Sequence, residues 1–383
     1  MKFVDSSVSI VETHTSLHGI YEDIERAGRY SYQSLGTRYF NVPDDKDEKV
    51  QKLIAELKDD EHVSVEQGAE FDHSYYVSIP NNILVFYPDL LNYEEETLET
   101  SPRYKNVSAK PFVDHLVNNK HMTPLEFGAI YLTFNKEQRG LVKKYVLNPY
   151  SRVVEKTFPK VIYAPEVIVD QFNTKGDPET FYFVTTNARV ICENGWEDDL
   201  KYLTKPTAFH EKRVTVKVTA SIGVTREWNR SRSLGIVELS TRWCNFSKDK
   251  FGKELTFIVP SWAYKLAQEP FYKEQASNEK GHSLMQVLTC LDRTAAAYWD
   301  CLERAEEDYM YLLSGAEGAA LKPQDARGVF PLDLKSEAIY CGYESDWEHF
   351  FELRTAQGAH PDIRKLAIDL KKQMTDAKIH GLF

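Results

Sequence analysis

Apolar and polar residues alternate most regularly between positions 214 and 222. Valine, alanine and isoleucine occupy every second position, and threonine, lysine and serine lie between them. A strand with this period of two buries one face and exposes the other. We therefore predict a strand here, and shorter apolar runs predict further strands at about 129–134, 161–164, 167–169, 181–185 and 255–259.

Other stretches carry apolar residues at every third or fourth position, which is the period of an amphipathic helix. The longest, from 284 to 313, predicts one long helix that stops at Gly315, because glycine readily adopts the left-handed conformation of a helix C-terminus. Further helices are predicted at 17–34, where the helix runs into a loop, and at 110–119, 345–355 and 361–374. This mixture predicts an α+β fold with a central mixed sheet flanked by long helices.

No repeat or low-complexity linker divides the chain, so we predict a single domain over residues 1–383. Dense charges at 44–62 and an acidic stretch at 92–99 surround one short apolar run at 83–87. Such charge runs indicate a solvated surface. Residues 36–108 are therefore interpreted as an insertion.

Composition and charge narrow the class of protein. The 383 residues carry a formal net charge of -11, which argues against general binding to nucleic-acid backbones or anionic lipid. The start lacks a signal-peptide pattern, and no apolar run approaches the roughly 20 residues that span a bilayer, so we expect a cytoplasmic protein. The five cysteines are scattered and odd in number, which predicts buried or incidental thiols. No metal site is expected.

A cluster of arginines follows the strand predicted at 214–222 in this otherwise acidic chain. Guanidinium forks, a hydroxyl and a carboxylate together suit a phosphate and a polar ring. The alternative is that these arginines are exposed and pair with acidic residues elsewhere, since surface ion pairs are common. The cluster comprises Arg226, Arg230, Arg232 and Arg242, with Glu238 and Ser240 between the last two.

The same segment resembles the signature of the flavin-dependent thymidylate synthase family, Arg-His-Arg-x-x-Ser-x-Asn-Glu-x-Ser-x-Arg-Tyr. Residues 230–243 keep the three arginines, the glutamate and the second serine, and replace the other four with Ser231, Gly235, Val237 and Trp243. Residues 36–108 and 136–205 match no family landmark and are interpreted as insertions. Other landmarks appear in the family's order as Arg29-Tyr30-Ser31-Tyr32, His121-Met122-Thr123-Pro124-Leu125-Glu126, Ala326-Arg327, Leu353-Arg354 and Ala359-His360-Pro361-Asp362-Ile363.

The resemblance implies an enzyme that methylates dUMP to dTMP. It implies FAD as cofactor, NADPH as reductant, methylenetetrahydrofolate as carbon donor, and a homotetramer whose sites combine residues of several subunits. Arg354 would hold the ionised ring nitrogen of uracil, because arginine stays charged and presents rigid paired donors.

The resemblance also assigns binding residues for both nucleotides. The residues implied for dUMP are Glu227, Arg230, Glu238, Ser240, Thr241, Arg242, Arg327 and Arg354. Those implied for FAD are Ser31, His121, Thr123, Glu126, Arg230, Ser231, Arg232, Glu238, Tyr343 and His349.

Simpler interpretations stay open at several of these positions. Arg354 could be an ordinary arginine on an amphipathic helix, Glu238 could only neutralise Arg230 or Arg242, and His121 could be a plain loop histidine. The replacements at positions 231 and 237 remove hydrogen-bonding capacity. They leave open a related one-carbon transfer, such as hydroxymethylation of another pyrimidine nucleotide, and a nucleotide-binding scaffold without flavin chemistry.

Overall fold

The structure is a computed structural model that describes most of the chain. The described residues are 1–31, 37–43, 47–59, 63–67, 74–80, 87, 89–90, 94–95, 109–158, 163–164, 167–168, 178–248, 251–316 and 318–377. Tyr32 of the first family landmark, most of the apolar run at 83–87, and parts of the runs at 161–164 and 167–169 lie outside these residues.

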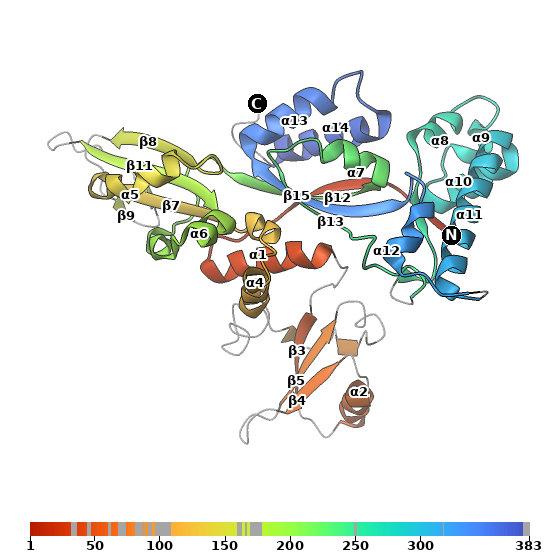
Figure 1. Cartoon of the computed structure of the whole chain (residues 1–383), viewed down its shortest axis with the longest axis horizontal. Coiled ribbons are helices and arrows are strands. Elements are labelled where there is room, and N and C mark those ends of the chain that lie inside the picture. The colour runs from red at the N-terminus through yellow and green to blue at the C-terminus, as the bar shows by residue number, and fades with distance from the viewer. Residues whose placement is uncertain are drawn as a thin grey trace.

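A four-stranded antiparallel sheet forms the centre of the molecule (Figure 1). Its order is β13 (Gly235–Glu238), β15 (Lys335–Tyr343), β12 (Arg213–Ser221) and β2 (Ser7–Val11). The alternation of β12 buries Val214, Val216, Val218 and Ala220 in one core cluster, which confirms the strand predicted there.

A parallel pair extends this sheet. β1 (Lys2–Val4) runs parallel to β14 (Thr256–Ile258), and an antiparallel bridge from Phe257 to Leu334 joins β14 to the chain just before β15. Parallel and antiparallel pairings therefore meet at the centre of the molecule, as predicted for a mixed sheet.

Helices cover both faces of the central sheet (Figure 1). One face packs on α7 (Ile222–Trp228), α13 (Glu344–Arg354) and α14 (Pro361–Asp376), which contribute Trp228, Trp347 and Leu370 to the core. On the other face, Val237 and Ile339 pack on Ala27 of α1 (Leu17–Tyr30) and on Phe127 of the short helix η3 (Thr123–Phe127). The α+β architecture with flanking helices is confirmed.

The long helix predicted from 284 to 313 is wrong in one respect, because the structure divides it in two. α10 (Gly281–Leu291) and α11 (Arg293–Ser314) are separated by Asp292, which is extended and accepts a hydrogen bond from the Ala295 amide as the N-cap of α11. The apolar period continues through the break and therefore could not reveal it. Gly315 ends α11 with φ of 65°, as predicted.

Further short helices pack beside α10 and α11. They are α8 (Ser261–Leu266), α9 (Lys273–Ala276), α12 (Pro323–Ala326) and η7 (Arg327–Val329), and they pack with α10, α11, β1 and β14 around Phe257 and Leu284.

A second sheet lies at the opposite end (Figure 1). Its order is β7 (Ala129–Asn135), β11 (Glu179–Asn187) and β8 (Arg152–Phe158), all antiparallel. The predicted strands at 129–134 and 181–185 are confirmed, whereas β8 was not predicted. The other elements here are α4 (Ala109–Asn118), η4 (Lys136–Gln138), α5 (Arg139–Val146), α6 (Ala188–Asn194), η5 (Glu197–Tyr202), β9 (Tyr163–Ala164) and β10 (Val167–Ile168).

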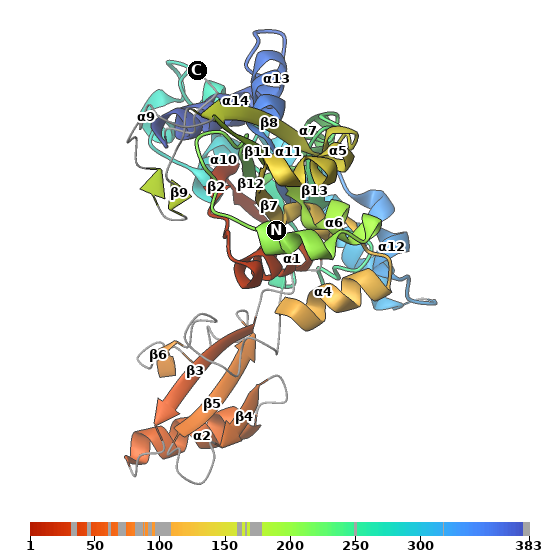
Figure 2. The same cartoon turned by 90° about the vertical axis from the view of Figure 1, so that its left-hand side faces the viewer.

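The described residues between 37 and 95 form a small unit that projects from the rest (Figures 1 and 2). Its core contains Phe40, Leu57 and Val77, which belong to no other cluster. That these residues and residues 136–205 are insertions into one domain remains a proposal. The elements are β3 (Thr37–Pro43), α2 (Glu48–Asp59), β4 (Ser64–Gln67), β5 (Ser74–Pro80) and β6 (Glu94–Glu95).

Two general features of the chain bear on the sequence analysis. All five cysteines are free thiols, with Cys244 and Cys341 buried and Cys290 and Cys301 exposed. None of the described helices combines the length and apolar composition that crossing a bilayer requires.

His210 fixes the loop before β12 to the second sheet. Its side chain lies in the core, where its ring packs edge-on against Tyr131 and Phe183. Nε2 donates to the Leu132 carbonyl at 3.1 Å, and Nδ1 accepts from the Thr207 amide at 3.1 Å. Burial lowers the pKa of His210 to about 4, because the charged imidazolium loses hydration.

This histidine predicts a specific loss of stability in acid. Its pKa is about 4 when folded and near 6.5 when unfolded. The unfolded chain therefore binds more protons between these values, and stability falls as the pH drops through the window, by roughly 3 kcal/mol in total for this group. Urea unfolding of the wild type should show this loss, and His210→Gln should show a smaller pH slope. Equal slopes would contradict the assignment.

Candidate functional site

Two adjacent pockets lie at the start of β13, and half of the residues predicted for dUMP and FAD line them. The first, called the α13 pocket, has a volume of about 680 Å³ and lies between the loop after α7 and the end of α13. Its lining includes Arg230, Ser231, Arg232, His349 and Arg354.

The second, called the Tyr343 pocket, has a volume of about 350 Å³. Arg232 and Ser233 line both pockets, so the two cavities are neighbours. Segments distant in the sequence converge here, from η3, the start of β8, the start of β12 and the end of β15. Its lining includes Thr123, Glu126, Arg152, Arg213, Arg232 and Tyr343.

Arg354 is held in a defined position at the α13 pocket. Nη1 donates to the Glu227 carboxylate at 2.7 Å, and Nη2 donates to the Glu227 backbone carbonyl. The Arg354 side chain is only 14% exposed, and its buried Nε has no partner among the described residues. Arg354 is therefore a positioned cation at the end of α13, and its predicted role at the uracil ring remains a prediction.

Glu227 also lies near a second cation. Its other carboxylate oxygen lies 3.6 Å from Nη1 of Arg230, which is largely exposed. His349 faces the same pocket from α13 and lies 3.5 Å from Glu352. The α13 pocket is therefore lined by a fixed cation, Arg354, and an exposed cation, Arg230. This arrangement suits an anionic or electron-rich ring.

The Glu238 carboxylate is occupied by neutral donors. It accepts hydrogen bonds from the Thr225 hydroxyl at 2.6 Å, the Ser336 hydroxyl at 2.7 Å and the Asn229 amide at 3.0 Å. The Tyr340 hydroxyl in turn donates to Asn229. The alternative that Glu238 neutralises Arg230 or Arg242 is therefore wrong. A direct role of Glu238 at a nucleotide remains a prediction.

Tyr343 forms the wall of its pocket with two guanidinium groups over its ring. Its hydroxyl donates to the backbone carbonyls of Tyr150 and Thr185, so the ring is fixed. The Cζ atoms of Arg152 and Arg213 lie 4.4 and 4.8 Å from the ring centroid. Such cation–π contacts favour retention of both charges at the pocket.

A second group of predicted residues lies at the other end of β13. The Ser240 amide donates to the Ser31 carbonyl at 2.8 Å, and Arg327 donates to the Thr241 hydroxyl at 3.1 Å. Arg242 is exposed and lies over the Trp243 ring, with 5.6 Å from Cζ to the ring centroid. We call these five residues, Ser31, Ser240, Thr241, Arg242 and Arg327, the β13-end group.

The β13-end group lines neither pocket. In both views α12, just before Arg327, lies on the side of the sheet away from α13 (Figures 1 and 2). One chain therefore brings Arg327 close to Thr241, but it does not bring these residues to Arg354.

A family model described as thymidylate synthase complementing protein matches residues 182–377, just over half of the chain. The chain belongs to this family. The family predicted from the sequence motifs is thereby confirmed. Residues 182–205, the last part of the second interpreted insertion, fall inside the matched stretch.

Individual relatives of this family member match shorter stretches. A flavin-dependent thymidylate synthase of Mycolicibacterium vanbaalenii is 31% identical over 26% of this chain and 40% of its own length. One of Mycobacterium avium is 29% identical over 24% and 38%. The chain thus spans about two fifths of the length of the curated relatives it matches.

A solved structure is also similar in part. It is a UMP/dUMP methylase, PolB from Streptomyces cacaoi, bound with 5-Br dUMP. The likeness covers 43% of this chain and 66% of the other, with 21% identity and a TM-score of 0.31.

The geometry explains one departure of this family member from the signature. A Cβ atom at Gly235 would lie 2.7 Å from Oε2 and 3.2 Å from Cβ of Glu126. Glu126 thus fills the space that the signature gives to a serine side chain. Its other oxygen accepts from Arg189 at 2.6 Å, a partner that the motifs did not reveal.

His121 lies outside both pockets. Its side chain is exposed, and its amide donates to the Leu116 carbonyl at the end of α4. Thr123 and Glu126, from the same landmark, do line the Tyr343 pocket. In the single chain, the predicted role of His121 as a wall of the site has no support.

Sequence reasoning missed Arg152, Arg189 and Arg213. Arg213 is the first residue of β12, the strand that the sequence predicts most clearly. A basic residue directly before that alternating stretch was the signal that could have identified Arg213. Arg152 and Arg189 fall in the second interpreted insertion, where no motif pointed to them. Their proximity to the site depends on pairing between distant strands, which local patterns do not reveal.

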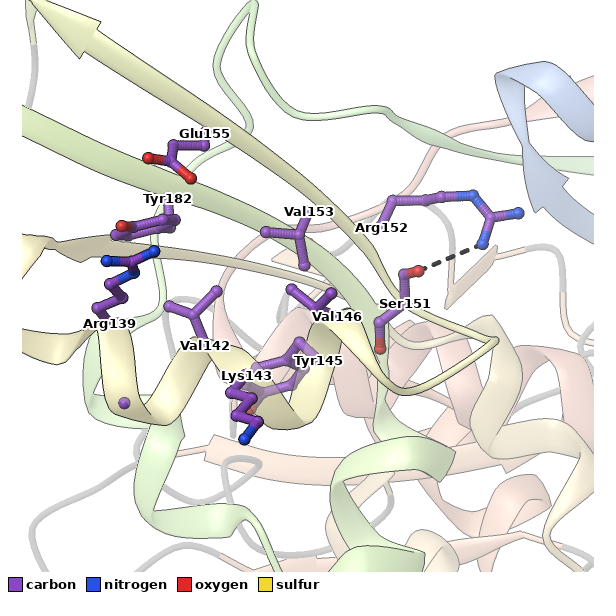
Figure 3. Close-up of a pocket in the computed structure, with 11 residues that line it drawn as sticks. Arg139, Val142, Lys143, Tyr145, Val146, Ser151, Arg152, Val153, Glu155 and Tyr182 are labelled. Atoms are coloured by element: carbon purple, nitrogen blue, oxygen red, sulfur yellow. Dashed lines mark hydrogen bonds between the residues drawn. The ribbon is translucent and has the colours of Figure 1, made fainter.

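A third cavity, called the α5 pocket, lies between α5 and the strands β8 and β11 (Figure 3). Its volume is about 680 Å³, and Arg139, Val142, Val146, Val153 and Tyr182 are among its lining residues. None of the residues predicted for dUMP or FAD lines it.

The Glu238 network predicts a measurable loss of stability. In Glu238→Gln, a neutral amide with one oxygen replaces a carboxylate that accepts three hydrogen bonds, so the charge-assisted part of these bonds is lost and at least one donor must reorient. We expect a loss of about 1–3 kcal/mol in the free energy of unfolding. Urea denaturation measures it, with Glu303→Gln on exposed α11 as the matched control. Equal stability of Glu238→Gln and the control would refute the structural role.

Proposed function

We propose that this chain is a flavin-dependent thymidylate synthase that converts dUMP to dTMP. In this proposal FAD is the cofactor, NADPH the reductant and methylenetetrahydrofolate the carbon donor, and the active form is a homotetramer. The observation that carries the proposal is the anchored Arg354 guanidinium at the α13 pocket, in a chain of this family.

Arg354 has the properties that ring activation requires. Carbon 5 of uracil becomes nucleophilic when negative charge on the ring amide is stabilised, and a preoriented cation in a partly dry site does this well. The two contacts of Arg354 with Glu227 fix its orientation before substrate arrives. The Glu227 carboxylate is 37% exposed and only partly offsets the charge of Arg354.

The β13-end group supplies donors suited to the dUMP phosphate. Arg242 and Arg327 are exposed cations beside the hydroxyl of Thr241. Converging guanidinium and hydroxyl donors form strong charge-assisted hydrogen bonds with a phosphate dianion. Their separation from Arg354 in one chain supports a site shared between subunits of the proposed homotetramer.

The residues of the Tyr343 pocket fit the phosphate-bearing part of FAD. Arg213 is almost fully buried, and its Nε finds no partner in the part of the chain that the structure describes. Arg152 and Arg232 line the same cavity. Thr123, Glu126, Tyr343, Ser231 and His349 would complete the binding surface across the two pockets. When bound, FAD supplies the hydride that completes the methyl group, while the protein binds, orients and shields the reactants.

Arg354→Gln tests the proposal. With FAD, NADPH and methylenetetrahydrofolate present, the wild type should release tritium from dUMP labelled at carbon 5 and form dTMP. Arg354→Gln should reduce the rate by about 100-fold or more, because a preoriented charge that stabilises the transition state is lost. The matched control, Arg304→Gln on exposed α11, should retain the wild-type rate.

Other outcomes would redirect the assignment. Tritium release with a hydroxymethylated product in place of dTMP would favour the related one-carbon transfer. A colourless wild type that binds nucleotide but no flavin would favour a scaffold. Full activity of Arg354→Gln would contradict the proposed role of Arg354.

A further inference from the structure

The Tyr343 pocket gathers three guanidinium groups from three separate segments. Arg152 begins β8, Arg213 begins β12, and Arg232 precedes β13. We propose that Arg152 and Arg213 bind the phosphate groups of a flavin nucleotide, and that Arg152 is an affinity determinant outside the family signature. This inference rests on the proposed function, since it names the part of the cofactor that this pocket holds.

Arg213 is a buried charge with no acidic partner among the described residues. It is 7% exposed, donates to the Glu126 carbonyl at 3.1 Å, and lies 3.5 Å from the Cys341 sulfur. Within the described part of the chain, its buried Nε has no hydrogen-bond partner. A buried cation satisfied only by neutral groups is costly, and a bound anion would offset that cost.

The acidic residues at this pocket have other partners. The Glu126 carboxylate pairs with Arg189 at 2.6 Å, and the Asp346 carboxylate accepts from the Tyr343 amide at 2.9 Å. Glu211 approaches Nε of Arg152 at 3.5 Å, a distance at which an ion pair is weak. The cations therefore retain attraction for an incoming anion.

The Tyr343 ring contacts both Arg152 and Arg213. Both guanidinium groups lie over the ring, which the two carbonyl contacts of its hydroxyl hold in place. Two like charges held at one fixed ring suit a ligand with adjacent negative groups, such as a diphosphate, because each phosphate can meet one planar fork.

Arg152 also lines the α5 pocket, but its guanidinium group points away from the apolar residues of that pocket. In Figure 3 this group extends away from Val142, Val146 and Val153, and the dashed line marks its hydrogen bond to the Ser151 carbonyl at 3.2 Å. The same guanidinium group lies 4.4 Å from the Tyr343 ring centroid, and Arg152 also lines the Tyr343 pocket.

Size supports a division of one ligand between two cavities. At about 350 Å³, the Tyr343 pocket can hold the phosphates and part of a ring system. The neighbouring α13 pocket, about 680 Å³, shares the lining residues Arg232 and Ser233 and has room for the remainder. The phosphate subsite would thus lie within one chain, whatever the partner subunits add.

Flavin titration of purified protein tests the inference without relying on activity. Flavin fluorescence is followed as protein is added to FAD, FMN or riboflavin, with wild type, Arg152→Gln and Arg139→Gln. Arg152→Gln should weaken FAD and FMN about tenfold or more, because a charge-assisted hydrogen bond to phosphate is lost. It should leave riboflavin, which has no phosphate, unchanged. Arg139→Gln, in the α5 pocket, should bind all three like the wild type.

Several results would overturn the inference. FAD affinity retained in Arg152→Gln would do so, as would an equal loss for riboflavin, which would mean contact with the flavin ring. Calorimetry showing that Arg152→Gln loses dUMP affinity and keeps FAD affinity would assign the pocket to substrate phosphate instead. A wild type that binds no flavin would overturn the proposed function together with this subsite, so the two failures are distinguishable.

Discussion

The Glu238 carboxylate is the interaction on which the arrangement of the site depends. It joins Thr225 on α7, Asn229 at the end of α7 and Ser336 on β15, while Glu238 itself ends β13. Asn229 directly precedes the arginine loop at 230–233. A carboxylate that accepts from three neutral donors is well satisfied without a cation. The loop arginines are therefore free to face the pockets.

The segment from Arg232 to Ser240, which contains β13, separates the two pockets from the β13-end group. Two pockets share Arg232 at its start, and the β13-end group lies beyond its other end. The four residues of β13 span roughly 13 Å. A nucleotide monophosphate bound within one chain would have to bridge this distance to contact both ends of the strand. Assembly of several chains is the simpler way to bring a phosphate site and a ring site together.

Local patterns predicted those parts of the molecule that depend on local physics. The alternation from 214 to 222 identified β12, and Gly315 marked the end of α11 because its positive φ is a local property. The same reasoning missed the break at Asp292, where a capping side chain interrupts a helix without disturbing the apolar period.

The candidate site likewise contains residues that local motifs predicted and residues that they missed. Motif residues such as Thr123, Arg232 and Arg354 do line the two pockets. Arg152 and Arg213 reach the Tyr343 ring only through strand pairing and the fixed tyrosine hydroxyl, and no spacing rule encodes such long-range contacts. The true partners of Glu238 were likewise hidden, because serine, threonine and asparagine at those positions look unremarkable in a sequence.

We propose that Arg327 and Arg354 of different subunits complete one active site. The most direct measurement is subunit complementation, in which Arg327→Gln and Arg354→Gln are each assayed alone and then co-expressed as mixed oligomers. The account predicts that each variant alone is inactive and that the mixture regains dTMP formation, because some sites then receive both native arginines. A mixture as inactive as its components would contradict it.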